Sequence, residues 1–175
     1  MRRAYRYRIY PDNEQQKQFL KTFGCCRFIY NRMLTDKKEW YEKHHEMLRT
    51  TPAQYKKEYE WMKEVDSLAL ANAQLHLEAA YRKFFREAKA GFPRYKSKRH
   101  PKQSYTTNVV NNNIRLEGKR LRLPKVGKVM IVLHRQIPAG DAQILEDGPQ
   151  DRCLVLLIQD DEGTGVLDHM AVLLQ

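Results

Sequence analysis

A segment near the middle of the chain carries the side chains best suited to bind a ligand. Residues 94–108 read Arg-Tyr-Lys-Ser-Lys-Arg-His-Pro-Lys-Gln-Ser-Tyr-Thr-Thr-Asn and include no acid. Lysine and arginine neutralise phosphates, hydroxyl and amide groups bond to phosphates or base edges, and tyrosine rings offer a surface on which bases stack. We therefore predict nucleic-acid contacts by Arg94, Tyr95, Lys96, Lys98, Arg99, Lys102, Ser104, Tyr105, Thr106, Thr107 and Asn108.

The uneven distribution of charge supports this interpretation. Residues 1–137 hold 31 Lys and Arg against 13 Asp and Glu, whereas residues 138–175 hold Arg152 against eight acids. Within 92–137 there are 12 basic residues and one acid, Glu117. Such a basic body favours a polyanionic partner, because bound lysines and arginines release the counterions of phosphates. A solvated basic loop is the alternative explanation of the segment 94–108.

Groups that could catalyse a reaction or bind a metal are scattered. The sequence contains no GxSxG, Walker A, HExxH or GxGxxG motif. The densest acidic run, 160–162, is interpreted as solvated, and no CxxC pair accompanies Cys25, Cys26 or Cys153. We therefore expect no catalytic site, no metal and no cofactor in this chain.

The elements that must position the basic residues begin with a strand. In residues 3–10 apolar side chains alternate with Arg6 and Arg8, which predicts a half-buried strand with a basic outer face. Asp12 and Gln15 then form a capping box for a helix that we expect to stop at Gly24.

A second helix is predicted from residue 26 to about residue 45, because apolar residues recur there at helical spacing. Two helices separated by one glycine resemble a helix-turn-helix, and a plain packing unit of two helices is the alternative. A short helix over 55–63 and a long one over 67–88 follow. The long helix carries apolar residues on two faces, including Leu75 and Phe85 on one, so both faces are expected to pack.

Beyond Pro93 the pattern changes from helix to strand. A glycine turn at 117–119 separates two alternating segments, which predicts a hairpin, and residues 129–133 predict one more strand. The order strand, helices, strands describes an α+β fold in which a helical block interrupts a small antiparallel sheet or barrel. No apolar run approaches the roughly 20 residues that span a bilayer, so we expect a cytoplasmic protein without a membrane partner.

A set of short motifs resembles the TnpB (OrfB-type) proteins of insertion sequences. The motifs occur in that family's order and spacing between residue 3 and about residue 137, and together they are specific although each one is weak. They are YRIYP at 7–11, FGCCRFIYN at 23–31, WMKEVDS at 61–67, YRKFF at 81–85, GFPRYK at 91–96, SYTTN at 104–108 and LRLPK at 121–125.

The resemblance implies a wedge-type antiparallel β-barrel interrupted by a helical recognition lobe, which contains the helix-turn-helix-like pair. Residues 1–10 would form the first barrel strand, 11–91 the helical lobe, 92–137 the basic β segment of the barrel, and 138–175 an acidic, atypical tail. Proteins of this family bind a guide RNA, recognise a short motif beside the DNA target, and cut DNA with an Mg²⁺-dependent RuvC domain.

The implied partners are therefore DNA and guide RNA. By the resemblance, Ser67 and the segment 104–111, which ends at Asn111, would lie near the target-adjacent duplex, while RNA pairing reads most of the sequence. Further contacts are predicted for side chains spread over the rest of the basic body: Arg6, Arg8, Arg27, Asn31, Arg120, Arg122 and Lys125.

The chain departs from the family after residue 137. The catalytic acids and the zinc knuckle of the family's nuclease domain have no counterpart, so Mg²⁺ and Zn²⁺ are expected only in missing C-terminal domains, and the barrel is expected to be incomplete. The acidic tail suggests a frameshift, with a divergent native strand pair as the alternative. We expect a nucleic-acid-binding N-terminal fragment that is not an enzyme. A nuclease-less repressor and a non-functional fragment are the alternatives, and the oligomeric state is open.

Overall fold

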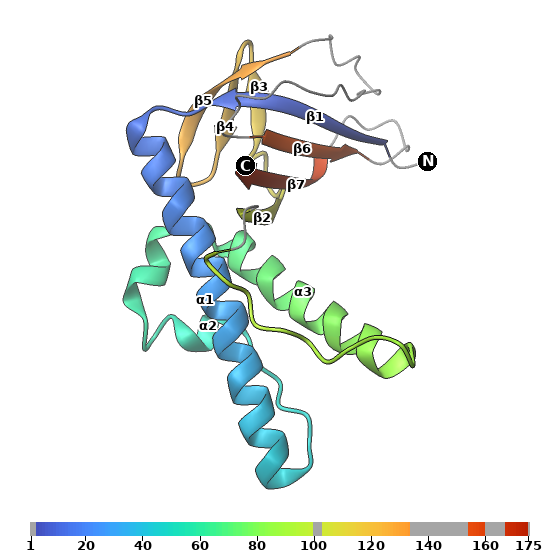
Figure 1. The fold of residues 1–175 in the computed structure, drawn as a ribbon. Helices are drawn as coiled ribbons and strands as arrows, with labels where there is room; N and C mark the ends of the chain where they lie inside the picture. The colour runs from blue at the N-terminus through green and yellow to red at the C-terminus, as the bar shows by residue number, and fades with distance from the viewer. Residues whose placement is uncertain (1–2, 100–102, 134–153, 160–166, 175) are drawn as a thin grey trace.

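The computed structural model of the chain has an antiparallel sheet at one end of a long helix, with a second long helix beside the first (Figure 1). The structure describes the backbone of residues 3–99, 103–133, 154–159 and 167–174, and the side chains of residues 7–99 and 103–133. The predicted α+β class is confirmed. None of the helices in these ranges is long and apolar enough to cross a membrane.

The sheet has seven strands in the order β2-β7-β6-β1-β5-β4-β3, and every neighbouring pair is antiparallel. The strands are β1 (Arg3–Tyr10), β2 (Gln103–Asn108), β3 (Arg115–Glu117), β4 (Arg120–Leu123), β5 (Gly127–Val132), β6 (Leu154–Gln159) and β7 (Leu167–Leu174). Since β2 and β3 are the edges of this order, the sheet is open among the described residues.

The alternating patterns of the sequence account for β1 and for the strands on one side of it, β5, β4 and β3. Tyr7 and Ile9 of β1 are buried as expected. The predicted hairpin is confirmed, because Glu117 of β3 pairs with Arg120 of β4 across Gly118. Gly118 has a φ of 61°, a left-handed conformation that glycine adopts without steric cost. The next predicted strand is confirmed as β5.

The region predicted to be an atypical tail contributes two strands. β6 pairs with β1 from Arg3 opposite Gln159 to Arg8 opposite Leu154, and β7 pairs with both β6 and β2. The two strands thus join β1 to β2 within one sheet (Figure 1). This pairing agrees with the alternative of a C-terminal strand pair, whereas the frameshift stays a prediction about the gene. The acidic run 160–162 lies outside the described residues.

Helix α1 (Asn13–His44) begins where the sequence predicts. The Asp12 carboxylate accepts a hydrogen bond from the Gln15 backbone N–H at 2.8 Å, and the Gln15 side-chain oxygen accepts one from the Asp12 N–H at 3.1 Å. This reciprocal pair satisfies two of the N–H groups that a helix start leaves without intrahelical partners.

The predicted break at Gly24 is wrong, because α1 runs through it without interruption. The two-helix unit expected there is one helix of 32 residues. A glycine inside a helix costs only about 1 kcal/mol relative to alanine. Phe23, Cys26 and Ile29 are buried around it, and burying one such apolar side chain contributes about as much or more.

The helix predicted over 55–63 is also wrong. Two short turns replace it, α2 (Pro52–Tyr55) and the 3₁₀ helix η1 (Glu60–Glu64). The Tyr55 hydroxyl donates to the Asp36 carboxylate of α1 at 2.5 Å, and Met62 is fully buried. Short helices are marginal in isolation, so these contacts with the rest of the fold decide the local path of the chain.

Helix α3 (Ser67–Arg86) lies beside α1 and ends two residues before the predicted end. Its apolar residues Leu70, Ala73 and Leu77 are buried. The expected packing on a second face is wrong, since Leu75 is 47% exposed and Phe85 is 67% exposed. Figure 1 shows why: α1 and the sheet lie on one side of α3, and no described helix or strand covers the other.

We predict that Leu77→Ala lowers the free energy of unfolding by about 2–5 kcal/mol, because truncating a buried leucine leaves a cavity. Phe85→Ala on the same helix is the matched control, and we expect it to cost less than about 1 kcal/mol because the side chain is largely in solvent. Urea unfolding measures both changes. Similar changes for the two variants would contradict the one-sided packing of α3.

Candidate nucleic-acid interface

One stripe of polar side chains on α1 holds the basic loop, which we define as residues 92–99. This polar stripe consists of Arg27, Asn31, Thr35 and Lys38. The spacings of four, four and three residues bring the four side chains onto one face of the helix. The basic loop contains no helix or strand, so its position depends on contacts with such neighbours.

Asn31 makes the most specific contact of the polar stripe. Its side-chain oxygen accepts from the Lys96 backbone N–H at 2.8 Å, and its amide nitrogen donates to the Lys96 carbonyl at 2.9 Å. The Asn31 amide therefore pairs with the backbone of the basic loop in the way that a neighbouring strand would. The structure gives the Asn31 side chain a positioning role, and its predicted contact with nucleic acid stays a prediction.

The other members of the polar stripe contact the chain on either side of Lys96. Arg27 Nη1 donates to Gln103 Oε1 at 3.1 Å, at the start of β2. The Thr35 and Tyr95 hydroxyls lie 3.2 Å apart. Lys38 Nζ lies 5.8 Å from the centre of the Tyr95 ring and 6.0 Å from that of Phe92, within the range of a cation–π interaction.

Lys96 is held at its backbone and again at its side chain. Its ammonium lies 4.6 Å from the centre of the Tyr30 ring, a cation–π contact. Partial burial lowers the pKa of Lys96, and the nearby Cys26 thiol opposes that shift. No carboxylate contributes to this pKa shift. A partly desolvated ammonium without a carboxylate partner favours an anion bound beside it.

A cavity of about 390 Å³ opens between the polar stripe, the basic loop and β2. Two cations, two serine hydroxyls, an amide and aromatic rings face it. Its lining residues are Phe23, Cys26, Arg27, Tyr95, Lys96, Ser97, Gln103 and Ser104. None of these residues is acidic, so the cavity has the lining of an anion site.

Strand β2 divides its predicted contacts between two faces. Ser104 is exposed and Thr106 is half-buried. Tyr105 is buried, with its ring 5.5 Å from Phe23 in an edge-to-face arrangement. Thr107 is fully buried, and its hydroxyl donates to the Asp66 carboxylate. Because successive strand residues point to opposite faces, the side chains of Tyr105 and Thr107 belong to the core and offer no surface to a ligand.

Asp66 connects this strand to helix α3. Its second carboxylate oxygen accepts from the Leu68 N–H at 3.1 Å, which caps the helix. Ser67, the first residue of α3, is exposed and its hydroxyl accepts from Lys56 Nζ at 2.7 Å. Asn108 accepts from the Asn72 amide at 2.9 Å, so its side chain also links strand to helix.

The remaining predicted contacts fall into two exposed groups. Arg94, Lys98 and Arg99 are exposed on the basic loop. The other group comes from β4 and from the turns after β2 and β4: Arg120, Arg122, Lys125 and Asn111. Arg8 is half-buried within β1, and the side chains of Arg6 and Lys102 lie outside the described residues.

The single acid of the segment 92–137 is already neutralised. Both Lys128 Nζ and Arg115 Nε lie 2.5 Å from the Glu117 carboxylate. Their hydrogen bonds lower the pKa of Glu117 to about 2, Lys128 contributing most. The carboxylate is thus charged near neutral pH and pairs with one cation of β3 and one of β5, which together leave a net charge of +1. The exposed charge of β4 therefore remains positive.

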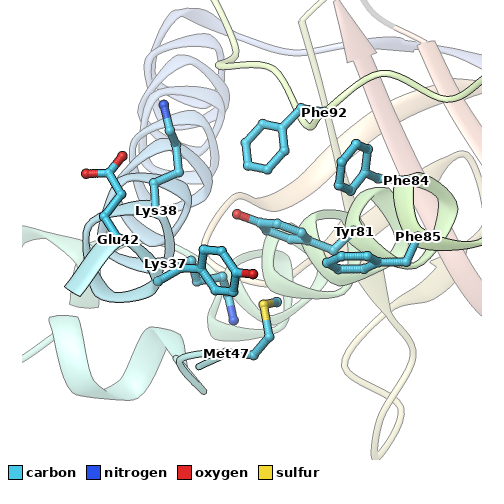
Figure 2. Close-up of a pocket in the computed structure, with 9 residues that line it drawn as sticks. Lys37, Lys38, Glu42, Met47, Tyr81, Phe84, Phe85 and Phe92 are labelled. Atoms are coloured by element: carbon cyan, nitrogen blue, oxygen red, sulfur yellow. The ribbon is translucent and has the colours of Figure 1, made fainter. Parts of the chain in front are cut away.

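A second cavity of about 400 Å³ lies at the outer ends of α1 and α3 (Figure 2). Figure 2 shows the rings of Tyr81, Phe84, Phe85 and Phe92 gathered on one side of it, with Met47 below them. Sequence reasoning assigned no contact to this cavity. Its lining is mainly aromatic, and the YRKFF and GFPRYK motifs supply the rings, of which Phe85 and Phe92 are exposed.

The described residues contain no group of three or more His, Cys, Asp and Glu side chains that could hold a metal ion. Cys25 and Cys26 are buried and make no disulfide. Burial raises the pKa of Cys25 to about 11 and also raises that of Cys26, so both stay protonated near neutral pH.

Fold and site together define a basic α+β protein whose exposed loop and cavity suit a polyanion. The model of a helix-turn-helix domain of OrfB proteins of the IS605 type matches residues 1–46. In the structure most of these residues belong to β1 and to the single helix α1. The match therefore indicates the family, and the two helices of a helix-turn-helix are not present among the described residues of this region.

Three curated relatives match longer stretches. A protein of Streptomyces pristinaespiralis, provisionally named an RNA-guided DNA endonuclease, is 34% identical over 59% of this chain and 27% of its own length. InsQ of Escherichia coli K12, named in the same provisional way, is 28% identical over 77% of this chain and 34% of its own length. The virulence protein VsdF of Salmonella dublin is 34% identical over 56% of this chain and 95% of its own length.

The chain belongs to the TnpB (OrfB-type) family of insertion-sequence proteins. It spans about a third or less of the two relatives named as endonucleases. The resemblance inferred from the motifs is confirmed.

The spacing of the polar stripe could have been found in the sequence. Arg27, Asn31, Thr35 and Lys38 repeat at helical spacing beside the apolar residues of the same helix. Sequence reasoning missed the stripe because it treated Arg27 and Asn31 as separate ligand contacts, although the helix predicted from residue 26 to about residue 45 contains all four residues.

We predict that Asn31→Ala releases the basic loop. The variant removes two hydrogen bonds to one backbone unit, each worth about 0.5–1.5 kcal/mol. Trypsin should then cut faster after Lys96, Lys98 and Arg99, while Asn13→Ala, at the exposed start of the same helix, should leave the rate unchanged. Mass spectrometry of timed digests locates the cuts. Equal rates in wild type and Asn31→Ala would show that other contacts hold the loop.

Proposed function

We propose that this protein binds DNA and a guide RNA through the basic loop, the exposed side of β2 and the cations of β4. The observation that carries the proposal is the polar stripe, whose residues Asn31, Thr35 and Lys38 hold an acid-free loop of cations against α1. A disordered loop of the same composition would lose conformational entropy on binding, and a positioned loop loses less.

The described cations are arranged for contact with phosphates. Arg94, Lys98 and Arg99 are exposed on the basic loop, and Arg120 and Arg122 are exposed on β4. Each phosphate that a lysine or arginine neutralises releases counterions, which favours binding at low salt. Ser104 and Thr106 on the outer side of β2 add hydroxyl donors beside the loop.

The guide RNA enters the proposal through the relatives. Two of them are named as RNA-guided DNA endonucleases, and the chain covers 27% and 34% of their lengths. In this proposal the matched region supplies binding as a wedge-type barrel and recognition lobe, and cleavage belongs to the parts of those relatives outside the match. The described residues are then a nucleic-acid-binding N-terminal region rather than a nuclease site.

A second candidate function is that of a DNA-binding regulator that acts without cutting. The matched region accounts for 95% of the length of VsdF, so a relative confined to this region exists as a protein of its own. Binding of DNA without a guide would favour the regulator, and guide-dependent retention of DNA would favour the first candidate.

We predict that replacing Lys96, Lys98, Arg99 and Lys102 by alanine flattens the salt dependence of binding. The slope of log K against log salt concentration should fall by about one unit for each phosphate that the variant no longer neutralises. Fluorescence anisotropy of a labelled oligonucleotide at several salt concentrations measures the slope in the wild type and the variant.

The matched control removes four cations that lie elsewhere: Lys43, Lys57, Lys63 and Lys83. We expect this control to keep most of the wild-type slope. Identical slopes for the two quadruple variants would show that these four cations make no special contribution to binding and that the basic loop is a solvated surface. A wild-type protein that binds neither RNA nor DNA at low ionic strength would overturn the proposed function itself.

A further inference from the structure

We propose that the cavity between α1, the basic loop and β2 seats one unstacked nucleotide of single-stranded nucleic acid, with its phosphate on Arg27 and Lys96 and its base against Tyr95. The inference rests on the proposed function and makes it specific. It assigns to this cavity a strand that is not in a duplex, such as a looped or unpaired part of an RNA.

The lining of the cavity matches the parts of a nucleotide. Arg27 and Lys96 supply positive charge, Ser97 and Ser104 supply hydroxyl groups, and Tyr95 supplies an aromatic ring. With no acidic residue among its lining side chains, the cavity does not repel a phosphate. A cation, a metal or an apolar ligand would leave these donors without acceptors.

The two cations are positioned before any ligand arrives. Arg27 Nη1 donates to Gln103 Oε1 at 3.1 Å, which orients the guanidinium and leaves the other N–H groups of its planar fork for a phosphate. The Lys96 backbone is held by Asn31, and its ammonium lies against the Tyr30 ring at 4.6 Å. A ring face supplies no lone pair that saturates an ammonium, so Lys96 keeps donors for an anion.

The shape of the site favours a single strand over a duplex. Duplex phosphates lie on a convex backbone and are met by side chains on a protein surface. A hollow of about 390 Å³ is of the size that takes a small ligand whole. A nucleotide can enter such a hollow only if its base has left the stack, as bases do in single strands and loops. Tyr95 is 51% exposed and lines the cavity, so its ring is available to that base.

The test compares a labelled 12-nucleotide single-stranded RNA with a duplex of the same length, each titrated with the full chain by fluorescence anisotropy. Arg27→Gln and Lys96→Met remove the proposed phosphate contacts, and Tyr95→Ala removes the ring. Stacking of one base on an aromatic side chain is worth about 5- to 150-fold in affinity, so Tyr95→Ala should weaken single-strand binding by a factor in that range. Duplex binding should change by less than about twofold.

Two controls separate the nucleotide seat from general effects. Lys57→Gln removes one exposed positive charge away from the cavity and should leave the preference for a single strand unchanged. Tyr95→Phe keeps the ring and removes the hydroxyl that lies 3.2 Å from Thr35, so it should retain single-strand affinity if stacking is the contact. Far-UV circular dichroism melts of every variant identify any that fails to fold, and Tyr95→Phe then carries the comparison.

The outcomes distinguish this inference from the proposed function. If the wild type binds nucleic acid but the three cavity variants behave like Lys57→Gln, the nucleotide seat is wrong and the proposed function stands. If single-strand and duplex affinities fall together in those variants, the cavity is part of a general cationic surface, and the inference is again wrong. If the wild type binds neither probe at low salt, the proposed function fails first.

Discussion

Two adjacent stripes on one face of α1 organise the described part of this protein. The apolar stripe, which includes Phe23, Ile29 and Met33, is buried and carries the core that the sheet and α3 complete. The polar stripe beside it binds the basic loop through Asn31 and Thr35, and the start of β2 through Arg27. Because both stripes lie on the same rigid helix, burial of the first fixes where the second can hold its loop. The long helix is therefore a scaffold for the candidate site as well as part of the core.

This arrangement separates residues that hold the site from residues that can bind a ligand. Asn31 uses its amide to hold the Lys96 backbone, and Thr107 directs its hydroxyl to Asp66. Tyr105 packs against Phe23. Each of these side chains has the chemistry of a nucleic-acid contact. Tyr105 and Thr107 are buried, however, and the Asn31 amide is already hydrogen-bonded to the Lys96 backbone. The side chains that remain available to a ligand are their exposed neighbours on the basic loop and on the outer side of β2.

The positive charge of the chain has a defined geometry in the fold. One group of cations lies on the basic loop and in the cavity beside it, and another lies on β4. On the neighbouring strand β3, the Glu117 carboxylate is already paired with Lys128 and Arg115. A cation in a cavity and a cation on an open strand favour different parts of a nucleic acid. A cavity of this size suits a single nucleotide, whereas an open strand surface suits a continuous backbone. The proposed binding of RNA and DNA together is consistent with such a division.

The sequence by itself determined the α+β class, the capping box at Asp12, the hairpin around Gly118, the family and the basic character of the site, because each depends on residues close together in the chain or on composition. Tertiary structure decided the rest. Burial kept α1 continuous through Gly24 despite the cost of a helical glycine, and left Phe85 exposed although its spacing suits a packed face. It also paired the Asn31 amide with the backbone of Lys96, 65 residues away in the chain. The sequence shows which interactions a side chain is able to make. The packing of segments that are distant in the chain decides which of those interactions it makes.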